Sequence, residues 1–217
     1  MVSSLQKQLT AKKKRDKELK GAIDAIVRRV IEAKKKEAAD AAARNNNATN
    51  NTVVTPNTST NKPVTTKTIV AFNTEADIKM SGSFESSRGK LPWPVDQGYV
   101  CTHFGSYQIE GTKIKGENGG VTICTAQPGV NVKSVFDGVV EAVFNVDDNK
   151  AVMIRHGKYF TVYSNLTSVS VSKGSEVKIN QVIGKVAVDD DDNEGGKLEF
   201  VLMIEAKNVN PESWLRK

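Results

Sequence analysis

At 217 residues, of which 38% are hydrophobic and 26% charged, the chain has room for one sizeable domain with appendages. No apolar run approaches the length of a bilayer-spanning helix. The first seven residues lack the apolar core of a secretion signal, so we expect any targeting segment to be absent or already removed. Residues 1–45 hold 13 Lys and Arg against 6 Asp and Glu, whereas the remainder is nearly neutral. Such a basic segment can bind nucleic acid or an anionic membrane. It contains no aromatic residue that could stack on bases, so we favour a solvated helix face and expect no nucleic-acid partner.

The basic segment also carries an apolar stripe with the spacing of a coiled coil. The positions alternate by four and three and are apolar from Leu19 to Ala33. The flanking residues are mainly good helix formers, so we predict a helix over residues 4–44 within a coiled-coil-like arm, 1–45. Because the stripe begins in mid-register, we expect some coiled coil to have been removed upstream of Met1. So narrow a stripe needs a partner, which can be missing sequence, a second copy of the chain or the following domain.

A change of composition separates this arm from the rest of the chain. Residues 46–67 are rich in Asn and Thr and have neither helical nor alternating periodicity, which indicates a flexible linker. Residues 68–90 carry scattered apolar side chains. We predict a short helix around Asn73–Met80, capped at its N-terminus by Thr74, and expect this segment to dock on the edge of the domain.

Residues 91–217 carry the signals of a β domain. Leu91–Val95 has two prolines around Trp93, which excludes a helix interior and suits an extended edge segment whose ring packs on the sheet. Short apolar runs punctuated by glycines predict a mainly β domain of antiparallel strands, closed or sandwich-like. The predicted strands are 99–104, 120–125, 131–136, 138–145, 151–156, 159–166, 176–179, 182–188 and 197–206. We expect Trp214 and Leu215 to cap the core from a turn or short helix.

The cysteines, histidines and acidic run do not combine into a metal site. Cys101 and Cys124 both fall in predicted strands, and we favour two buried thiols, with one disulfide as the alternative in an oxidising compartment. We interpret His156, at a strand end, as an exposed turn residue. His103 could join Cys101 and Cys124 in an improvised metal site. However, Cys101 and His103 are only two residues apart in a strand, and nothing supplies a fourth ligand. The run Asp189–Gly196 lacks the spacing of a calcium loop, so we interpret it as a solvated hairpin loop.

Several short phrases follow one another along the β domain with few gaps. They are 91–95, 104–105, 129–135, 137–140, 155–157, 161–163, 182–186 and 210–215. In this order they resemble the LytM-type (M23-like) zinc peptidases, which cut bacterial cell-wall peptides. The resemblance implies the LytM-type fold over residues 91–217: a duplicated hybrid motif with an antiparallel β-sandwich or barrel-like form, preceded here by the helical arm.

The residues that would bind zinc in this family are substituted. Active members hold zinc with three protein ligands, two from a His-x-x-x-Asp pair and the third from a later His-x-His pair, and a further histidine acts on the transition state. The first pair corresponds to Asn118 and Thr122, the second to Lys197 and Glu199, and the further histidine to Asn165. Amide, hydroxyl and ammonium groups do not replace imidazole or carboxylate ligands. The resemblance therefore implies no catalytic residue, no metal and no cofactor.

A metal-free LytM-type domain behind a helical arm and a linker resembles the EnvC-type murein hydrolase activators. This resemblance implies a periplasmic, non-catalytic protein of cell division whose groove binds and activates an N-acetylmuramoyl-L-alanine amidase. It also implies that the coiled coil meets an FtsEX-like division transporter and that a helix of the chain can cover the groove. The expected groove residues are Asn118, Val121, Thr122, Tyr163, Asn165, Lys197, Glu199 and Met203.

Two other functions have their own tests. A passive peptidoglycan-binding or scaffold module would sediment with cell-wall sacculi in the absence of an amidase. An active cell-wall metallopeptidase would hydrolyse peptidoglycan and lose that activity with a chelator.

Overall fold

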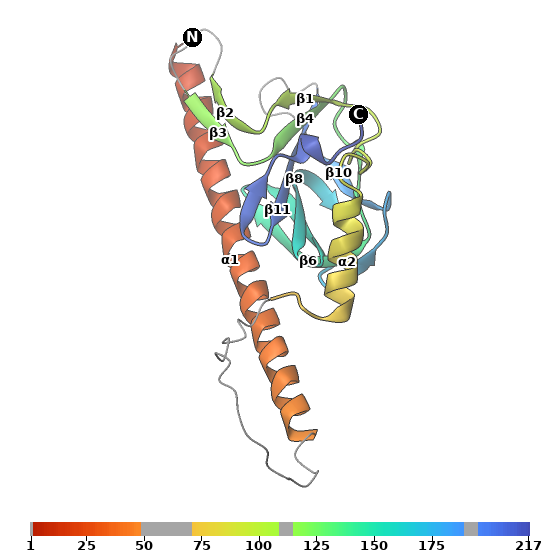
Figure 1. Cartoon of the computed structure of the whole chain (residues 1–217). Coiled ribbons are helices and arrows are strands. Elements are labelled where there is room, and N and C mark those ends of the chain that lie inside the picture. Colours follow the sequence, from red (N-terminus) through yellow and green to blue (C-terminus); the bar gives the residue numbers. More distant parts are fainter. Residues whose placement is uncertain (1, 49–70, 109–114, 189–194) are drawn as a thin grey trace, which may run out of the picture.

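The computed structural model describes residues 2–48, 71–108, 115–188 and 195–217. It is mainly β, with a ten-stranded antiparallel sheet, a separate two-stranded hairpin and two α-helices on different sides of the sheet (Figure 1). The helices are α1 (Val2–Ala48) and α2 (Glu75–Ser86), and a 3-10 turn, η1 (Pro211–Ser213), lies near the C-terminus. The strands are β1 (Tyr99–Thr102), β2 (Gly105–Gln108), β3 (Lys115–Asn118), β4 (Val121–Thr125), β5 (Asn131–Lys133), β6 (Gly138–Val146), β7 (Asn149–His156), β8 (Tyr159–Val169), β9 (Glu176–Val177), β10 (Val182–Val186), β11 (Gly196–Ile204) and β12 (Lys207–Val209).

The strand order confirms the predicted mainly β, antiparallel domain. Along the large sheet it runs β1-β4-β11-β8-β7-β6-β9, with β10 joining β8 and β5, and β12 joining β11. The barrel-like form is not observed, because among the described strands this order ends at β1 and β9 and does not close on itself. Each of the nine predicted strands overlaps an observed one. Sequence analysis missed β2, β3 and β12, which are short and mostly polar and lack apolar alternation.

The two faces of the sheet carry two separate clusters of buried residues. Side chains alternate between the faces along a strand, so in β11 Leu198 and Phe200 enter the main core, whereas Val201 and Met203 enter a second cluster. The main core also contains most of the buried aromatic rings. The second cluster lies between the sheet and α1.

The middle part of helix α1 covers the second face of the sheet, and its C-terminal end projects beyond the sheet (Figure 1). Leu19, Ile23, Val27 and Val30 are buried there, against side chains from β6, β7, β8 and β11. Their spacing of four, four and three residues places them on one side of the helix. The partner of the predicted stripe is therefore the following domain, and within the described residues α1 does not form a coiled coil with another helix.

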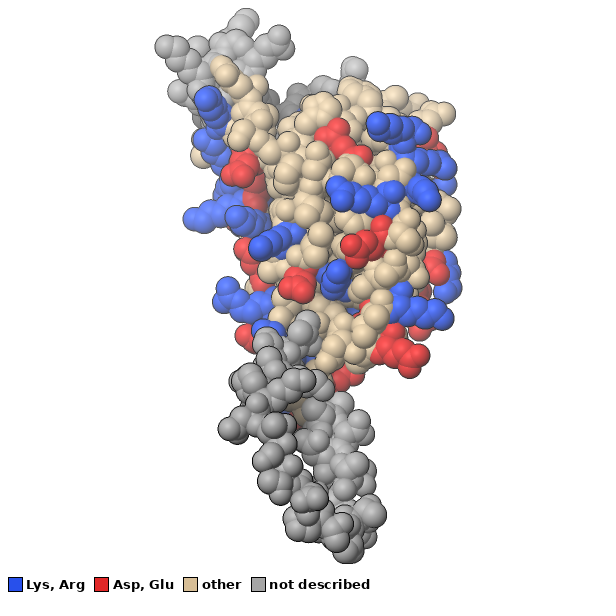
Figure 2. Space-filling model, viewed as in Figure 1, with Lys and Arg blue, Asp and Glu red and all other residues tan. Residues whose placement is uncertain are grey.

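The charges of α1 mainly face solvent. Figure 2 shows Lys and Arg side chains along the outer flank of this helix, with Asp and Glu among them. The exposed basic residues include Lys13, Lys14, Lys17, Lys20, Arg28, Arg29, Lys35 and Lys36. This confirms the predicted solvated helix face. In the described part of the chain, neither helix combines the length and apolar composition that a membrane crossing requires.

Helix α2 begins as predicted but continues further. The Thr74 side chain accepts a hydrogen bond from the Asp77 backbone N–H at 3.1 Å, which makes Thr74 the N-cap. The helix extends to Ser86 because Phe84, in its last turn, is fully buried in the main core. Gly157, at φ +70°, permits this approach, since a Cβ there would collide with the Ser81 hydroxyl of α2. The segment thus docks on the domain through specific close contacts.

The prediction of an exposed His156 is wrong. Its ring is fully buried and stacks on Phe84, with centroids 4.9 Å apart. Nδ1 lies 2.6 Å from the Asp137 carbonyl oxygen, which can only accept, so Nδ1 donates and Nε2 accepts from the Thr161 hydroxyl at 2.9 Å. Burial lowers the pKa of His156 to about 4, so the ring is neutral near pH 7. The last turns of α2, beyond the predicted end of that helix, cover this strand end.

The cysteines form a disulfide instead of the two thiols that we favoured. Strands β1 and β4 pair in antiparallel register, which brings the Cα atoms of Cys101 and Cys124 to 5.8 Å. This separation is ordinary for a disulfide. The alternative that we gave for an oxidising compartment is therefore the one observed.

Two further predictions concern the end of the chain and the loops. Trp214 and Leu215 are buried in the main core next to η1, as predicted. Residues 46–48 belong to α1, and the rest of the expected linker lies outside the described residues, as does most of the acidic run, residues 189–194.

Candidate functional site

Three of the substituted ligand positions meet on the sheet face that α1 covers. Thr122 of β4 lies directly opposite Glu199 of β11 in the antiparallel register, and opposite residues point to the same face. Glu199 shares this face with Val201 and Met203 of the second cluster. Asn118, at the end of β3, reaches the pair from the side, with Nδ2 3.5 Å from the Thr122 hydroxyl oxygen. The fold thus brings together three of the positions that the resemblance assigns to zinc ligands.

Both asparagines of the site are held by hydrogen bonds within the protein. Asn118 donates from Nδ2 to a backbone carbonyl of β1 at 3.3 Å, and its Oδ1 accepts from the Gly120 N–H at 3.3 Å. Asn165, at φ +65°, donates from Nδ2 to the Lys197 carbonyl at 2.7 Å. Its Oδ1 accepts from the Asn149 amide at 2.7 Å. These side chains act as structural links between neighbouring strands.

The residues of the site do not fit a zinc ion. Zinc binds thiolate, imidazole and carboxylate groups, and among the five substituted positions only Glu199 carries one of these. The amides of Asn118 and Asn165 are engaged as described above. Among the residues that the structure describes, no three His, Cys, Asp or Glu side chains are grouped so that they could hold a metal ion. The donor set suits hydrogen bonding, and we assign no metal-dependent step to it.

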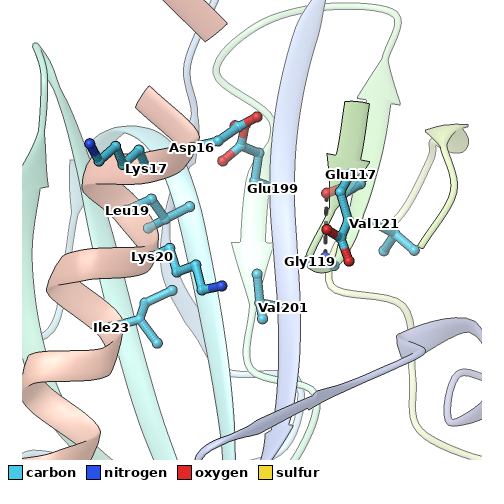
Figure 3. Close-up of a pocket in the computed structure, with 12 residues that line it drawn as sticks. Asp16, Lys17, Leu19, Lys20, Ile23, Glu117, Gly119, Val121, Glu199 and Val201 are labelled. Atoms are coloured by element: carbon cyan, nitrogen blue, oxygen red, sulfur yellow. Dashed lines mark hydrogen bonds between the residues drawn. The ribbon is translucent and has the colours of Figure 1, made fainter. Parts of the chain in front are cut away.

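A cavity of about 290 Å³ lies between the N-terminal half of α1 and the site. Figure 3 shows Asp16 of α1 and Glu199 of β11 pointing toward one another, and Lys20 extending from α1 toward β11. The cavity thus combines apolar walls with charges of both signs. Its lining residues are Asp16, Lys17, Leu19, Lys20, Ile23, Glu117, Asn118, Gly119, Gly120, Val121, Glu199 and Val201. Helix α1 therefore covers the site without filling it.

Sequence analysis expected that a helix of the chain can cover the groove, but it missed Tyr107 of the β2–β3 hairpin and Asp16 of α1. Tyr107 of β2 packs over Gly116 of β3, where a Cβ would collide with its ring. Burial, with the nearby carboxylates of Asp16 and Glu199, raises the pKa of Tyr107. In the sequence, the only feature that could have indicated the position of Tyr107 is Gly116, which lies opposite it in the hairpin. Asp16 is a polar residue within the predicted apolar stripe of α1, and its side chain faces the site.

The other predicted groove residues divide between the two faces. Met203 is fully buried beneath α1, whereas Val121, which borders the cavity, belongs to the main core opposite Phe200. The structure places Tyr163 in the main core on the opposite face, where its hydroxyl accepts from the Val135 N–H at 2.9 Å and burial raises its pKa. The reason is the alternation along β8, which sends Val162 toward α1 and Tyr163 away from it.

An ion pair ties each end of the buried stripe of α1 to the domain. Toward the N-terminus, Arg15 Nε lies 3.4 Å from Asp147 Oδ2, in the turn between β6 and β7. Toward the C-terminus, Lys34 Nζ lies 3.3 Å from Asp77 Oδ2 of α2. We call these the Asp147 end and the Asp77 end of the α1-binding face. The apolar stripe lies between them.

The Asp77 end is the more buried of the two. The side chain of Asp77 is 7% exposed, and Arg155 Nη1 lies 2.6 Å from Asp77 Oδ1. Burial by itself would raise the pKa of Asp77, but the Thr74 hydroxyl and the charges of Arg155 and Lys34 outweigh it and hold the pKa below its usual value. The carboxylate is therefore ionised at neutral pH, and it joins α1, α2 and β7 in one network.

Residues 116–211 match the profile of Peptidase family M23. An uncharacterised protein of Neisseria meningitidis serogroup B is 31% identical to the chain over 141 residues, which make up 64% of this chain and 22% of that protein. The chain thus spans about a fifth of the length of this curated relative.

Several solved structures are also similar to the chain. Csd3 of Helicobacter pylori is 24% identical, with a TM-score of 0.49 over 60% of this chain and 38% of Csd3. A zinc-containing peptidase from Vibrio cholerae is 24% identical, with a TM-score of 0.49 over 58% of this chain and 40% of that one. The SpoIIQ–SpoIIIAH pore-forming complex gives 21% identity and a TM-score of 0.48 over 60% of this chain and 93% of the matched chain. The family match supports a peptidase M23 (LytM-type) domain over residues 116–211, to which α1 and α2 are joined.

Proposed function

We propose that the chain is a non-catalytic activator of an N-acetylmuramoyl-L-alanine amidase, acting in the periplasm during cell division, and that α1 closes its partner-binding face. One observation carries the proposal: the apolar stripe of α1 is buried on the same sheet face as Thr122 and Glu199. The donor set of the site does not fit zinc, so this face is better suited to binding a partner than to hydrolysis. The amidase as partner comes from the resemblance to EnvC-type activators.

The mechanism is a competition between α1 and the partner for one face. A partner can shift the equilibrium only by the difference between its affinities for the open and the closed chain. While Leu19, Ile23, Val27 and Val30 occupy the face, an amidase helix has no access to it. Anything that draws α1 away raises the fraction of open chains and hence activation.

Two further features support the setting. The Cys101–Cys124 disulfide suits an oxidising compartment such as the periplasm. The C-terminal end of α1 projects beyond the sheet (Figure 1), where it is accessible to an FtsEX-like division transporter. We propose this transporter as the partner that moves α1.

An amidase assay with a loosened α1 tests the function. Val27→Asp puts a carboxylate into the fully buried contact beneath α1, which strongly disfavours the closed state. The matched control Ala25→Asp adds the same carboxylate on the exposed side of the same helix. We expect Val27→Asp to raise amidase activity at least tenfold over the unaltered chain, and Ala25→Asp to leave it unchanged.

Equal activation by both variants would contradict closure by α1. Peptidoglycan hydrolysis by the chain alone, abolished by a chelator, would contradict a non-catalytic role. Sedimentation with sacculi, without any effect on the amidase, would favour the passive peptidoglycan-binding module instead.

A further inference from the structure

The face beneath α1 is acidic at both ends, and α1 places one basic residue at each end. Arg15 pairs with Asp147 and Lys34 pairs with Asp77, at 3.4 and 3.3 Å. Positions 15, 19, 23, 27, 30 and 34 are separated by four or three residues, so the two cations and the four buried apolar residues lie on one side of the helix. The face therefore recognises a pattern of charges as well as an apolar stripe.

The Asp77 end needs a cation from whatever helix lies on it. Asp77 and Glu141 both pair with Arg155, at 2.6 and 3.1 Å, so two carboxylates share one guanidinium. Lys34 brings a second positive charge, which it shares with Glu37 of α1 at 2.9 Å. A helix that covers this end without a cation buries the carboxylates of Asp77 and Glu141 with Arg155 as their shared partner, which is unfavourable. A replacing helix with a basic residue at this place avoids that cost.

The spacing of the two ends sets a length. Arg15 and Lys34 are 19 positions apart, which is about 28 Å along a helix at 1.5 Å per residue. A helix shorter than about 20 residues cannot reach Asp147 and Asp77 together. A short amphipathic helix would therefore meet the apolar stripe but leave one acidic end without a partner.

We infer that the partner of this face is a helix of another protein that repeats the pattern of α1: a basic residue, an apolar stripe beginning four residues later with spacing four-four-three, and a second basic residue four residues after the stripe. This inference rests on the proposed function of the face and specifies its partner. Within that function, the helix belongs to the amidase. A partner with acidic residues at either end is rejected, because it meets Asp147 or Asp77.

The test uses the full chain carrying Val27→Asp, which loosens α1 without altering the face itself. A fluorescent peptide with the sequence of residues 13–36 is titrated against it. A second peptide carries Arg15→Glu and Lys34→Glu. A third carries the same charge change at the exposed positions, Arg28→Glu and Arg29→Glu. We expect the second peptide to bind at least tenfold more weakly than the native one and the third to bind within twofold of it.

A charge swap sharpens this test. A peptide with Arg15→Glu alone is expected to recover affinity when the chain carries Asp147→Lys, because the ion pair is rebuilt in the opposite sense. The inference is overturned if the peptide with Arg15→Glu and Lys34→Glu binds as tightly as the native peptide and the control peptide do. It is also overturned if the native peptide does not bind. A Val27→Asp dimer that excludes the peptide would also overturn it, since the occupant would then be α1 of a second copy.

If Val27→Asp does not fold, amide hydrogen exchange of α1 in otherwise unaltered chains gives the same information. Exchange is expected to be at least tenfold faster with Arg15→Glu and Lys34→Glu than with Arg28→Glu and Arg29→Glu. Equal exchange would overturn the inference. The peptide and exchange experiments contain no amidase, so they test the inference separately from the amidase assay. If peptide binding depends on the two charges but the amidase does not respond to the chain, only the proposed function is contradicted.

Discussion

The two helices of this chain are held on the sheet in different ways. The shorter, α2, is interlocked with the main core: Phe84 stacks on Tyr159 and His156 with centroids 4.7 and 4.9 Å apart, and Gly157 lets the backbones approach closely. The longer, α1, lies on a mixed aliphatic and aromatic cluster that includes Phe160, has an ion pair at each end of its stripe and leaves a cavity of about 290 Å³ beneath its N-terminal half. Helix length is therefore a poor guide to how firmly a helix is attached.

This difference separates two functions. Opening α2 is costly because its interlocked side chains would lose several packing partners at once. A helix that lies on an apolar face, as α1 does, can open as a separate unit. We expect α2 to unfold only with the whole domain and α1 to open while the sheet stays intact.

Phe84→Ala has the largest expected effect. It removes a fully buried ring that contacts four other rings, those of Phe136, His156, Tyr159 and Trp214. We expect the free energy of unfolding to fall by about 3–5 kcal/mol in urea titrations. Ile78→Ala, on the exposed side of the same helix, is the control and is expected to change it by less than about 0.5 kcal/mol. A Phe84→Ala loss below about 1 kcal/mol would mean that α2 is not interlocked with the core.

His156 makes the main core sensitive to acid. Its pKa is about 4 in the folded chain against 6.5 for the free side chain, so the unfolded state takes up a proton first as pH falls. Stability is full above pH 6.5 and declines as pH falls toward 4, by about 3 kcal/mol in all. Urea titrations across this range measure the slope. His156→Gln should remove most of it, and His103→Gln, at an exposed histidine, should retain it.

Ile23→Ala is expected to act on α1 alone. It removes a buried side chain of the stripe, and the free energy of opening α1 should fall by about 2–3 kcal/mol. Hydrogen exchange of the α1 amides reports this opening, and the protection of β7 and β8 should stay unchanged. Glu32→Ala, on the exposed side of α1, is the control. Equal loss of protection in α1 and in the sheet would show that the two unfold together.

Arg15→Gln has the smallest expected effect. The Arg15–Asp147 pair is partly exposed, and such pairs contribute about 0.2–1 kcal/mol. The variant should open α1 slightly faster than the unaltered chain at low salt. At about 1 M salt, where screening is nearly complete, the difference should vanish. A difference that persists at high salt would indicate that the Arg15 stem, and not its charge, holds the helix.

Much of the fold could be predicted from the sequence because its signals are local. Short apolar runs between glycines marked the strands, the four-three spacing marked α1, and Thr74 marked the start of α2. The extent of α2 and the burial of His156 could not be predicted, since both depend on Phe84 meeting a distant strand end. Which partner the stripe of α1 takes is likewise a tertiary property.

The site could be predicted only in part. The substituted positions Asn118, Thr122 and Glu199 do meet in space. Tyr163 was expected beside them, yet strand alternation sends its ring to the opposite face. Asp16 and Tyr107 carried no recognisable motif and reach the site from separate elements.

Hydrogen exchange of the full chain with and without an amidase tests the central claim most directly, that the partner replaces α1. We predict that amides between Arg15 and Lys34 lose protection when the amidase binds, while those of β8 and β11 keep theirs. Full protection of α1 in the amidase-bound chain would contradict the account, because the partner would then occupy a different surface.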